Sequence, residues 1–485
     1  MAVSDLMSIL PELALLVAAS AILLIDAWLP ERHRMASYYL SQVALGVTLV
    51  LVLLGLGQGP EDTFGGAFAP DGVSQVLKVA VLVVTMVVLS YSRDHLRQRG
   101  MLRGEYFVLA LFSVLGMMVL ASSKSLVVLY LGLELLALGQ YALVAFRRDH
   151  PSGAEAAMKY FVLGALSSGM LLYGMSILYG LTGTLFIEGI AGGIASGQAD
   201  TVGVLFATTF LVIGVGFKLG VAPFHMWIPD VYEGAPTPVA LFIGAAPKIA
   251  AFALMYRVLI DGLPSIEADW AQMLALLAAA SLVLGNVVAI AQTNFKRMLA
   301  YSTIGHMGFV LLGFVATGAA GAGAAMFYAI TYALMAAAAF GVLLLLDREG
   351  VDAESLDDFK GLNQRSPWFA FMMLLVMFSM AGVPPTIGFH AKLVVLDALI
   401  GSGDWLWLAV LAVVTAVIAA FYYLRIVRIM YFDPPLEESV NGALLESGRI
   451  PDMRVLLSAN GLLLLLLGLF PGPLIGLCLQ VVGVV

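Results

Sequence analysis

The sequence predicts an all-α polytopic membrane protein with about fourteen transmembrane helices, and three observations lead to this fold class. Hydrophobic residues make up 61% of the 485 residues and charged residues 12%, and the mean hydropathy is +0.99, values far outside the range of soluble globular domains. Apolar runs of roughly 20 residues, the length that crosses a bilayer, recur along the whole chain. Lysine and arginine are distributed very unequally between alternate loops, as the positive-inside rule requires.

The apolar runs give the expected elements in chain order, and together they form one membrane domain over residues 1–485. Residues 1–104 hold the first three helices, and residues 433–485 hold the fourteenth. Each span begins where polar or charged residues give way to an uninterrupted apolar stretch. The expected spans are 6–28, 38–57, 73–92, 105–121, 124–146, 155–181, 202–228, 236–259, 267–291, 297–316, 322–346, 367–400, 404–430 and 455–480.

The seventh and twelfth spans are expected to be broken helices. Pro223 lies within the seventh, and Pro384 and Pro385 lie within the twelfth, each close to a lysine. Proline removes a helical hydrogen bond, and the carbonyls that it frees must find polar partners in a membrane. Paired interrupted helices are typical of inverted-repeat transporters. We therefore expect two inverted five-helix repeats, over 105–260 (helices 4–8) and 261–432 (helices 9–13).

The loop charges predict the orientation. Eighteen of the 24 lysines and arginines lie in or beside loops that follow odd-numbered spans, whereas only Lys124 and Arg257 lie in loops that follow even-numbered spans. Cytoplasmic loops are the ones enriched in these residues. Both termini are therefore expected on the periplasmic side, and the first residues do not have the basic start of a cleavable signal peptide.

Several ionisable side chains lie deep within apolar spans. Lys218, Lys248 and Lys392 are in the seventh, eighth and twelfth spans, and Glu134 is in the fifth. A charge at such depth costs several kcal/mol unless it has a polar partner or water, so these groups indicate a path for ions or protons. His306 in the tenth span is either a proton-relay group or a satisfied buried histidine.

Two other charged residues within spans have a simpler interpretation. Lys78 lies about two turns into the third span, where its side chain is expected to extend to the outer surface. Glu12 near the start of the first span is expected to have a structural role.

The sequence excludes some classes of chemistry. It has no GxxxxGK[ST] loop for a nucleotide and no dinucleotide fingerprint. Its single cysteine, Cys478, excludes an intrachain disulfide and a cysteine-based metal site. The net charge of −8 gives no footprint for nucleic acid. We therefore expect no cofactor and no metal in this chain.

Five motifs resemble a known family, the antiporter-like subunits of proton-pumping NADH:quinone oxidoreductase, respiratory complex I. The run GFKLGVAPFHMWIPDVYEGAPTPV over 216–239 is similar to the family signature, and its DVYEGAPTPV part resembles the N-type branch rather than the L and M types. The other four motifs surround deep ionisable residues. These motifs are LGLELLALGQYALVAF, APKIAAF, NFKRMLAYSTIGHMGF and GVPPTIGFHAKL. The resemblance covers essentially the whole chain.

The resemblance implies a role for each deep residue in a proton relay. Glu134 and Lys218 would form the pair of the first half-channel. Lys248 would be the central connecting group. Lys392 would be the terminal group of the second half-channel, with His306 between it and Lys248.

The resemblance also implies partners and a location. NADH, FMN, iron–sulfur clusters and quinone would be bound by partner subunits of the complex, in its membrane and hydrophilic arms. APK beside Lys248 favours ubiquinone over plastoquinone. The 16 arginines against 8 lysines are typical of a GC-rich bacterial genome, which places the chain in a bacterial inner membrane.

Three hypotheses remain open from the sequence. The first is the proton-translocating subunit of NADH:quinone oxidoreductase. The second is a subunit of a multi-subunit cation/proton antiporter or of a membrane hydrogenase, which the DVYEGAPTPV run disfavours. The third is a structural membrane scaffold that pumps nothing, which the deep lysines disfavour.

Overall fold

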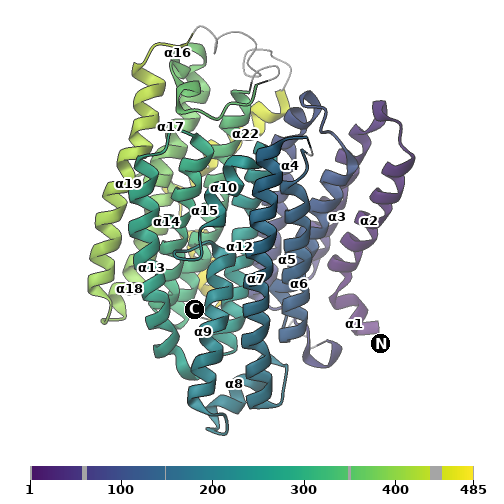
Figure 1. The fold of residues 1–485 in the computed structure, drawn as a ribbon, viewed down its shortest axis with the longest axis vertical. Helices are drawn as coiled ribbons and strands as arrows, with labels where there is room; N and C mark the ends of the chain where they lie inside the picture. The colour runs from purple at the N-terminus through teal and green to yellow at the C-terminus, as the bar shows by residue number, and fades with distance from the viewer. Residues whose placement is uncertain (1–2, 57–62, 148, 348–350, 437–450, 484–485) are drawn as a thin grey trace. The chain divides into compact units, whose positions relative to one another are not determined.

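The computed structural model describes residues 3–56, 63–147, 149–347, 351–436 and 451–483. Within these ranges the regular elements are helices (Figure 1). Thirteen helical stretches of the described residues are long and apolar enough to cross a membrane. This is the expected all-α fold, because only helices satisfy every backbone group within one segment in lipid. Residues 437–450 of the segment that leads into the last expected span lie outside the described ranges.

The chain divides into two compact units. The first unit comprises residues 1–86, 102–219 and 246–274. Its helices include the one that carries Glu134, α6, and the one that carries Lys218, α9. The helices wholly within this unit are α1 (Val3–Ser8), α2 (Leu10–Trp28), α3 (Met35–Leu54), α5 (Gly104–Ser122), α6 (Leu126–Val144), α7 (Pro151–Thr182), α8 (Ile187–Ala195), α9 (Thr201–Leu219) and α12 (Ala246–Met255).

The second unit comprises residues 87–101, 220–245 and 275–485. Helix α4 (Gly72–Gln98) and helix α13 (Glu267–Ile290) each have residues in both units. The other helices of the second unit are α10 (Trp227–Gly234), α11 (Thr237–Gly244), α14 (Phe295–Val315), α15 (Gly318–Leu345), α16 (Leu362–Arg365), α17 (Pro367–Ala381), α18 (Ile387–Gly401), α19 (Leu406–Phe432), α22 (Pro451–Leu469) and α23 (Gly472–Val481).

Glycines allow two helix pairs to approach closely. In the first unit α5 runs beside α6 (Figure 1), and a Cβ on Gly116 would lie 2.5 Å from the backbone nitrogen of Leu136. In the second unit a Cβ on Gly285 would lie 2.6 Å from the nitrogen of Gly305. Contacts between small residues of this kind drive helix association in lipid. They fix the backbones that carry Glu134 and His306.

The two predicted helix breaks are confirmed. Helix α9 ends at Leu219, and the chain is not helical again until α10 begins at Trp227. Helix α17 ends at Ala381, and α18 begins at Ile387. Each break starts with a glycine of positive φ, Gly220 at 81° and Gly382 at 86°, and contains one cis X–Pro bond, before Pro223 and before Pro385 respectively.

A third break, within the eighth span, was not predicted. Helix α11 ends at Gly244, and Ala245 has φ −109° and ψ −93°, outside the helical region, before α12 begins. The segment that follows α12, Tyr256–Asp261, is a π-helix. π-Helical segments within α-helices occur often at functional sites. Pro247 beside Lys248 was the local sign of this irregularity.

The expected count of fourteen spans differs from the thirteen long apolar helices found among the described residues. The region 367–400 is divided into α17 and α18 of 15 residues each, so neither alone reaches spanning length. The last span also ends earlier than expected, since α22 stops at Leu469 and Pro471 precedes the separate helix α23. The two five-helix repeats remain a prediction.

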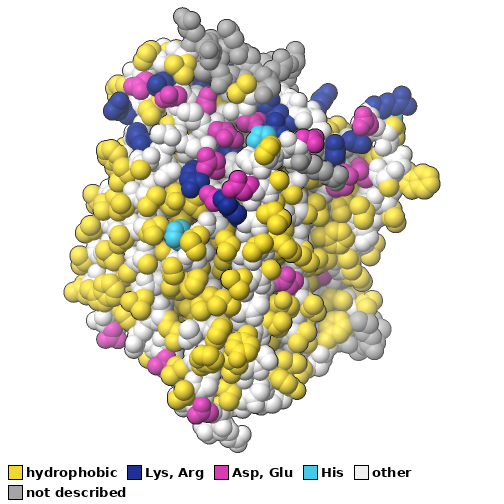
Figure 2. Space-filling view, viewed as in Figure 1, with side chains coloured by type: hydrophobic (Ala, Val, Ile, Leu, Met, Phe, Trp, Pro, Cys, Tyr) yellow, Lys and Arg dark blue, Asp and Glu magenta, His cyan; other side chains and the backbone are white. Residues whose placement is uncertain are grey.

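Hydrophobic side chains cover much of the molecular face seen in Figure 2. Large apolar residues such as Leu24, Val417 and Leu276 are 66%, 69% and 70% exposed. A soluble protein rarely exposes contiguous apolar surface of this kind, whereas lipid tails accept it. The surface therefore supports the multi-pass membrane assignment.

Candidate functional site

Glu134 and Lys218 both lie in the first unit, on α6 and α9, and they interact electrostatically. The Lys218 ammonium also lies 6.0 Å from the centre of the Tyr141 ring. Glu134 Oε1 and the Tyr141 hydroxyl are buried, and neither has a hydrogen-bond partner among the described residues. The pairing of Glu134 with Lys218 that the family resemblance implies stays a prediction.

Lys248 is buried at 1% exposure on α12. Its ammonium donates a hydrogen bond of 2.9 Å to the backbone carbonyl of Leu219, the last residue of α9. The C-terminal carbonyls of a helix have no partner within the helix and carry partial negative charge. The break in the seventh span therefore supplies the polar partner that the deep lysine in the eighth span needs.

Lys392 repeats this arrangement in the second unit. Its ammonium donates hydrogen bonds of 2.7 Å and 3.1 Å to the carbonyls of Ala381 and Met380, at the C-terminal end of α17. The ammonium also lies 5.4 Å from the centre of the Phe309 ring. Lys248 and Lys392 thus each place their charge at the end of an interrupted helix, where carbonyl dipoles favour a cation.

His306 is held by two tyrosines within the second unit. Its Nδ1 is hydrogen-bonded to the Tyr328 hydroxyl at 2.8 Å, and its Nε2 to the Tyr423 hydroxyl at 3.0 Å. The Tyr423 hydroxyl in turn reaches the Ser302 hydroxyl at 2.5 Å. A hydroxyl can both donate and accept, so this chain of groups can pass a proton without gaining or losing one overall.

A small cavity of about 10 Å³ lies between His306 and Lys392 and is also lined by Asn286, Phe309 and Tyr423. This volume matches the space that a single water molecule occupies. The cavity brings together two of the five sequence-predicted groups and Tyr423, which was not predicted. No sequence signal distinguished Tyr423 as this partner, because tyrosines are common in apolar spans.

The five sequence-predicted relay residues therefore fall into two sets. Glu134, Lys218 and Lys248 belong to the first unit, and His306 and Lys392 belong to the second. The hydroxyl and amide groups that surround the second set were not among the predicted site residues. They include Ser302, Tyr328 and Tyr423. Beside them, the Tyr422 hydroxyl donates a hydrogen bond of 3.0 Å to Asn286.

A separate ionic cluster occupies the first unit around Arg257, which is 1% exposed. The guanidinium donates hydrogen bonds of 2.7 Å to both Asp71 and Asp261 and also donates to the carbonyl of Ala121. Lys124 lies 3.3 Å from Asp261. The π-helix places Arg257 and Asp261 on one turn, so that a single side chain connects three segments of the unit.

The pKa of the Asp71 carboxyl, which precedes α4, reflects this cluster. Burial alone raises it, but the guanidinium of Arg257 and the N–H of Ser74 outweigh burial and hold the pKa below its usual value. A carboxylate whose folded pKa is lowered stabilises the fold at every pH above its unfolded pKa, and this contribution is lost only as the pH falls through the folded value.

We expect Asp71→Asn to lower the unfolding free energy by about 1–3 kcal/mol, the range for hydrogen bonds to charged groups. The loss should be equal at pH 6 and pH 8, because Asp71 is ionised at both. Thermal unfolding of the purified protein measures it. Glu31→Gln is the matched control, since Glu31 pairs with Arg34 at an exposed site and its loss should change little. A loss present at pH 8 and absent at pH 6 would contradict this assignment.

The expectation that Lys78 extends to the surface is wrong. Lys78 is 3% exposed and forms an ion pair of 2.6 Å with Glu12 of α2. The Phe68 ring lies beneath its ammonium, with 5.1 Å to the ring centre. The two residues are 66 positions apart in the sequence, so no local pattern signals the pair. Glu12 is the partner of Lys78, and its structural role stays a prediction.

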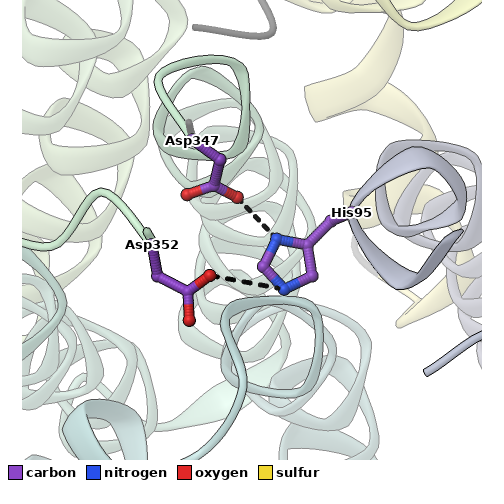
Figure 3. A group of neighbouring side chains, drawn as sticks. All are labelled: His95, Asp347 and Asp352. Carbon is purple, nitrogen blue, oxygen red and sulfur yellow. Dashed lines mark hydrogen bonds and ion pairs between the residues drawn. The ribbon is translucent and has the colours of Figure 1, made fainter. Parts of the chain in front are cut away.

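Another cluster in the second unit joins the end of α4 to the segment that follows α15 (Figure 3). His95 Nδ1 lies 2.5 Å from Asp347, and its Nε2 lies 4.0 Å from Asp352, which also accepts a hydrogen bond from Arg99. Burial raises the pKa of the Asp347 carboxyl, which the bonds from His95 and from the N–H of Ala353 oppose. Ligand atoms of this kind also suit metal ions, but here each is already engaged by a protein group. We interpret the cluster as a structural contact.

Comparison with known proteins agrees with this architecture. Residues 123–419 match the family described as NADH:quinone oxidoreductase/Mrp antiporter, TM. The sequence is 54% identical to NADH-quinone oxidoreductase subunit N of Thioalkalivibrio sulfidiphilus over 98% of both chains. The fold is similar to a chain in respiratory complex I from Thermus thermophilus with bound aureothin, with a TM-score of 0.81 and 35% identity over 96% of this chain and 98% of that one.

The fold is also similar to a chain in the Mrp complex from Dietzia sp. DQ12-45-1b, with a TM-score of 0.84 and 21% identity over 99% of this chain and 97% of that one. At that identity the likeness shows the fold alone. The family match over 123–419 places the chain in the class of antiporter-like membrane subunits. Within this class the sequence identity decides the branch. The chain belongs to the family of NADH-quinone oxidoreductase subunit N.

Proposed function

We propose that this chain is the proton-translocating membrane subunit of an NADH:quinone oxidoreductase, in which Glu134, Lys218, Lys248, His306 and Lys392 carry the protons. The complex is placed in a bacterial inner membrane, with both termini of this chain on the periplasmic side. NADH oxidation at FMN and iron–sulfur clusters, and quinone reduction, occur in partner subunits and supply the energy. The APK motif, which ends at Lys248, favours ubiquinone as the electron acceptor.

The observation that carries the proposal is the carbonyl partner of two of the three deep lysines, Lys248 and Lys392. Lys248 and Lys392 donate to backbone carbonyls at the ends of α9 and α17. A neutral amine still has N–H groups that can donate to a carbonyl, so this contact is available both before and after the lysine loses its proton. A carboxylate partner, such as the one that holds Lys78, favours only the charged form. Carbonyl partners thus suit proton exchange.

The relay within each unit follows from the same chemistry. Glu134 beside Lys218 favours the protonated lysine, so a change in either charge alters the proton affinity of the other. In the second unit a proton could pass from Lys392 through the small cavity to His306 and its tyrosines. The neutral amine, the neutral imidazole and the hydroxyl each donate and accept hydrogen bonds, so each can receive a proton and pass one on.

We expect Glu134→Gln to lower NADH-driven proton uptake by at least about tenfold, since a positioned proton-transferring side chain contributes roughly 10²–10⁴-fold. Glutamine has nearly the same shape but no charge to place beside Lys218. Proton uptake and NADH oxidation are measured together in inverted membrane vesicles, with assembly checked on native gels. Glu134→Asp, which keeps the charge, should retain much of the uptake. Unchanged pumping by Glu134→Gln would remove this residue from the relay.

The same vesicles separate the two alternatives. A cation/proton antiporter exchanges sodium or potassium for protons when an ion gradient is imposed without NADH. A structural scaffold shows normal pumping per assembled complex in every variant of the five residues. The family membership favours the NADH-driven reaction, since the fold is shared with the Mrp class whereas the high sequence identity is to subunit N.

A further inference from the structure

An open groove of about 620 Å³ lies between the N-terminal parts of α17 and α22 in the second unit. From α17 it is lined by Trp368 and Phe369, and from α22 by Arg454, Val455 and Leu462. The α22 residues span two helical turns, about 12 Å along the axis. The groove is therefore mostly apolar, with hydroxyl groups from Ser366 and Ser458, and it carries one cationic group near the end where both helices begin.

Among the described residues, no acidic side chain forms an ion pair with Arg454. Its guanidinium lies over the Phe369 ring, 5.9 Å from the ring centre, and its Nε is buried with no hydrogen-bond partner among the described residues. The nearest acid in sequence, Asp452, instead pairs with Arg93 at 3.0 Å. The guanidinium therefore retains donors that an oxyanion could fill.

Trp368 marks the depth of the groove in the membrane. Its indole N–H donates a hydrogen bond of 2.8 Å to the Ser458 hydroxyl, and the ring is 47% exposed. Tryptophan with one polar contact and one apolar face is typical of the membrane–water interface. By the loop charges, α17 and α22 both begin at the cytoplasmic face, where anionic lipids attract basic groups.

We infer that this groove binds an anionic phospholipid, whose phosphate contacts Arg454 beside Trp368 and whose acyl chain lies along Phe369, Val455 and Leu462. Charge complementarity favours this occupant, because the described lining residues include one cationic side chain, Arg454, and no acidic one. Basic pockets between transmembrane helices on the cytoplasmic side are the usual sites for such headgroups. The inference is independent of the proton relay, since none of the relay residues lines the groove.

Photoactivatable lipids test the inference on the assembled complex in lipid nanodiscs. A phosphatidylglycerol probe with a diazirine in its acyl chain should label peptides from 367–381 and 451–469 more strongly than a phosphatidylcholine probe does. Arg454→Gln should lower phosphatidylglycerol labelling about fivefold, the effect of one basic residue near an anionic headgroup, and leave phosphatidylcholine labelling unchanged. Excess inorganic phosphate should not compete with the lipid.

Two further variants complete the test. Arg428→Gln removes an exposed arginine of α19 that does not line the groove, and it should change neither probe. Ala459→Phe fills the groove while keeping Arg454, and it should lower labelling by both probes. An unchanged ratio of the two probes in Arg454→Gln would overturn the inference. A second result would also overturn it: neither probe labels the wild-type peptides, and a crosslinker placed at Val455 captures another subunit. The groove would then be a protein interface.

Discussion

Membrane vesicles that carry Lys248→Gln should lose NADH-driven proton uptake by at least about tenfold while the complex still assembles, since a proton-transferring side chain contributes roughly 10²–10⁴-fold. Glutamine keeps an N–H donor for the carbonyl of Leu219, the partner that the ammonium holds at 2.9 Å. It cannot bind or release a proton. The substitution therefore separates the chemistry of Lys248 from its structural contact at the end of α9.

Lys248→Arg and Lys248→Ala extend this comparison. Arginine keeps the charge and the donors but holds its proton at any accessible pH, so it should not restore full pumping. Alanine leaves the buried carbonyl of Leu219 without this donor, which costs about 1–3 kcal/mol and should lower the amount of assembled complex. If Lys248 were only structural, arginine would restore function and glutamine would pump at the wild-type rate per complex. Full pumping in the alanine variant would sink the relay role.

The sequence was sufficient to predict the breaks in α9–α10 and α17–α18 because their causes are local. Pro223 and Pro385 cannot donate to a helix wherever they lie in an apolar span, and Gly220 and Gly382 accept the positive φ at which each helix ends. The depth of Lys218, Lys248 and Lys392 was equally local, since it depends only on their distance from the ends of the apolar runs. These features follow from composition and spacing.

The partners of these groups could not be predicted, because they depend on which helices meet. Leu219 is 29 residues before Lys248, and Tyr423 is 117 residues after His306. The backbone carbonyl of Leu219 has no sequence signature, and tyrosines in apolar spans are common. The same reason explains the incorrect expectation for Lys78, whose partner Glu12 belongs to a different helix. The break at Ala245 was missed although Pro247 lies in the middle of the expected eighth span, where the rule that predicted the other two breaks also applies.

One physical device unites the sites in the two units. An interrupted helix exposes carbonyls in a region without bulk water, and a lysine from another helix satisfies them. The resulting charge is stabilised by dipoles rather than by a carboxylate, which keeps it responsive to nearby charges. Lys392 donates to two carbonyls of α17. We therefore expect its contact with the helix end to depend on more than one donor.

Lys392→Gln should accordingly reduce both pumping and assembly. The ammonium donates to Ala381 at 2.7 Å and to Met380 at 3.1 Å, and a shorter amide cannot reproduce both contacts. Leaving one buried carbonyl unsatisfied costs about 1–3 kcal/mol, so the amount of complex on native gels should fall. Proton uptake per assembled complex should fall at least about tenfold, because the proton-binding group beside the His306 cavity is lost.

Lys392→Arg distinguishes the effect on assembly from the effect on pumping. The N–H groups of the arginine guanidinium can donate to both carbonyls, whereas its positive charge is permanent. Assembly should then return toward the wild-type level while proton uptake stays low. Arg425→Lys is a matched control on α19: Arg425 donates to the carbonyls of Ile290 and Gln292 but lines no relay cavity, so pumping per complex should be unchanged. If Lys392→Arg restores assembly and pumping together, Lys392 is a helix-end contact, and proton transfer in the second unit would have to depend on His306 and its tyrosines alone.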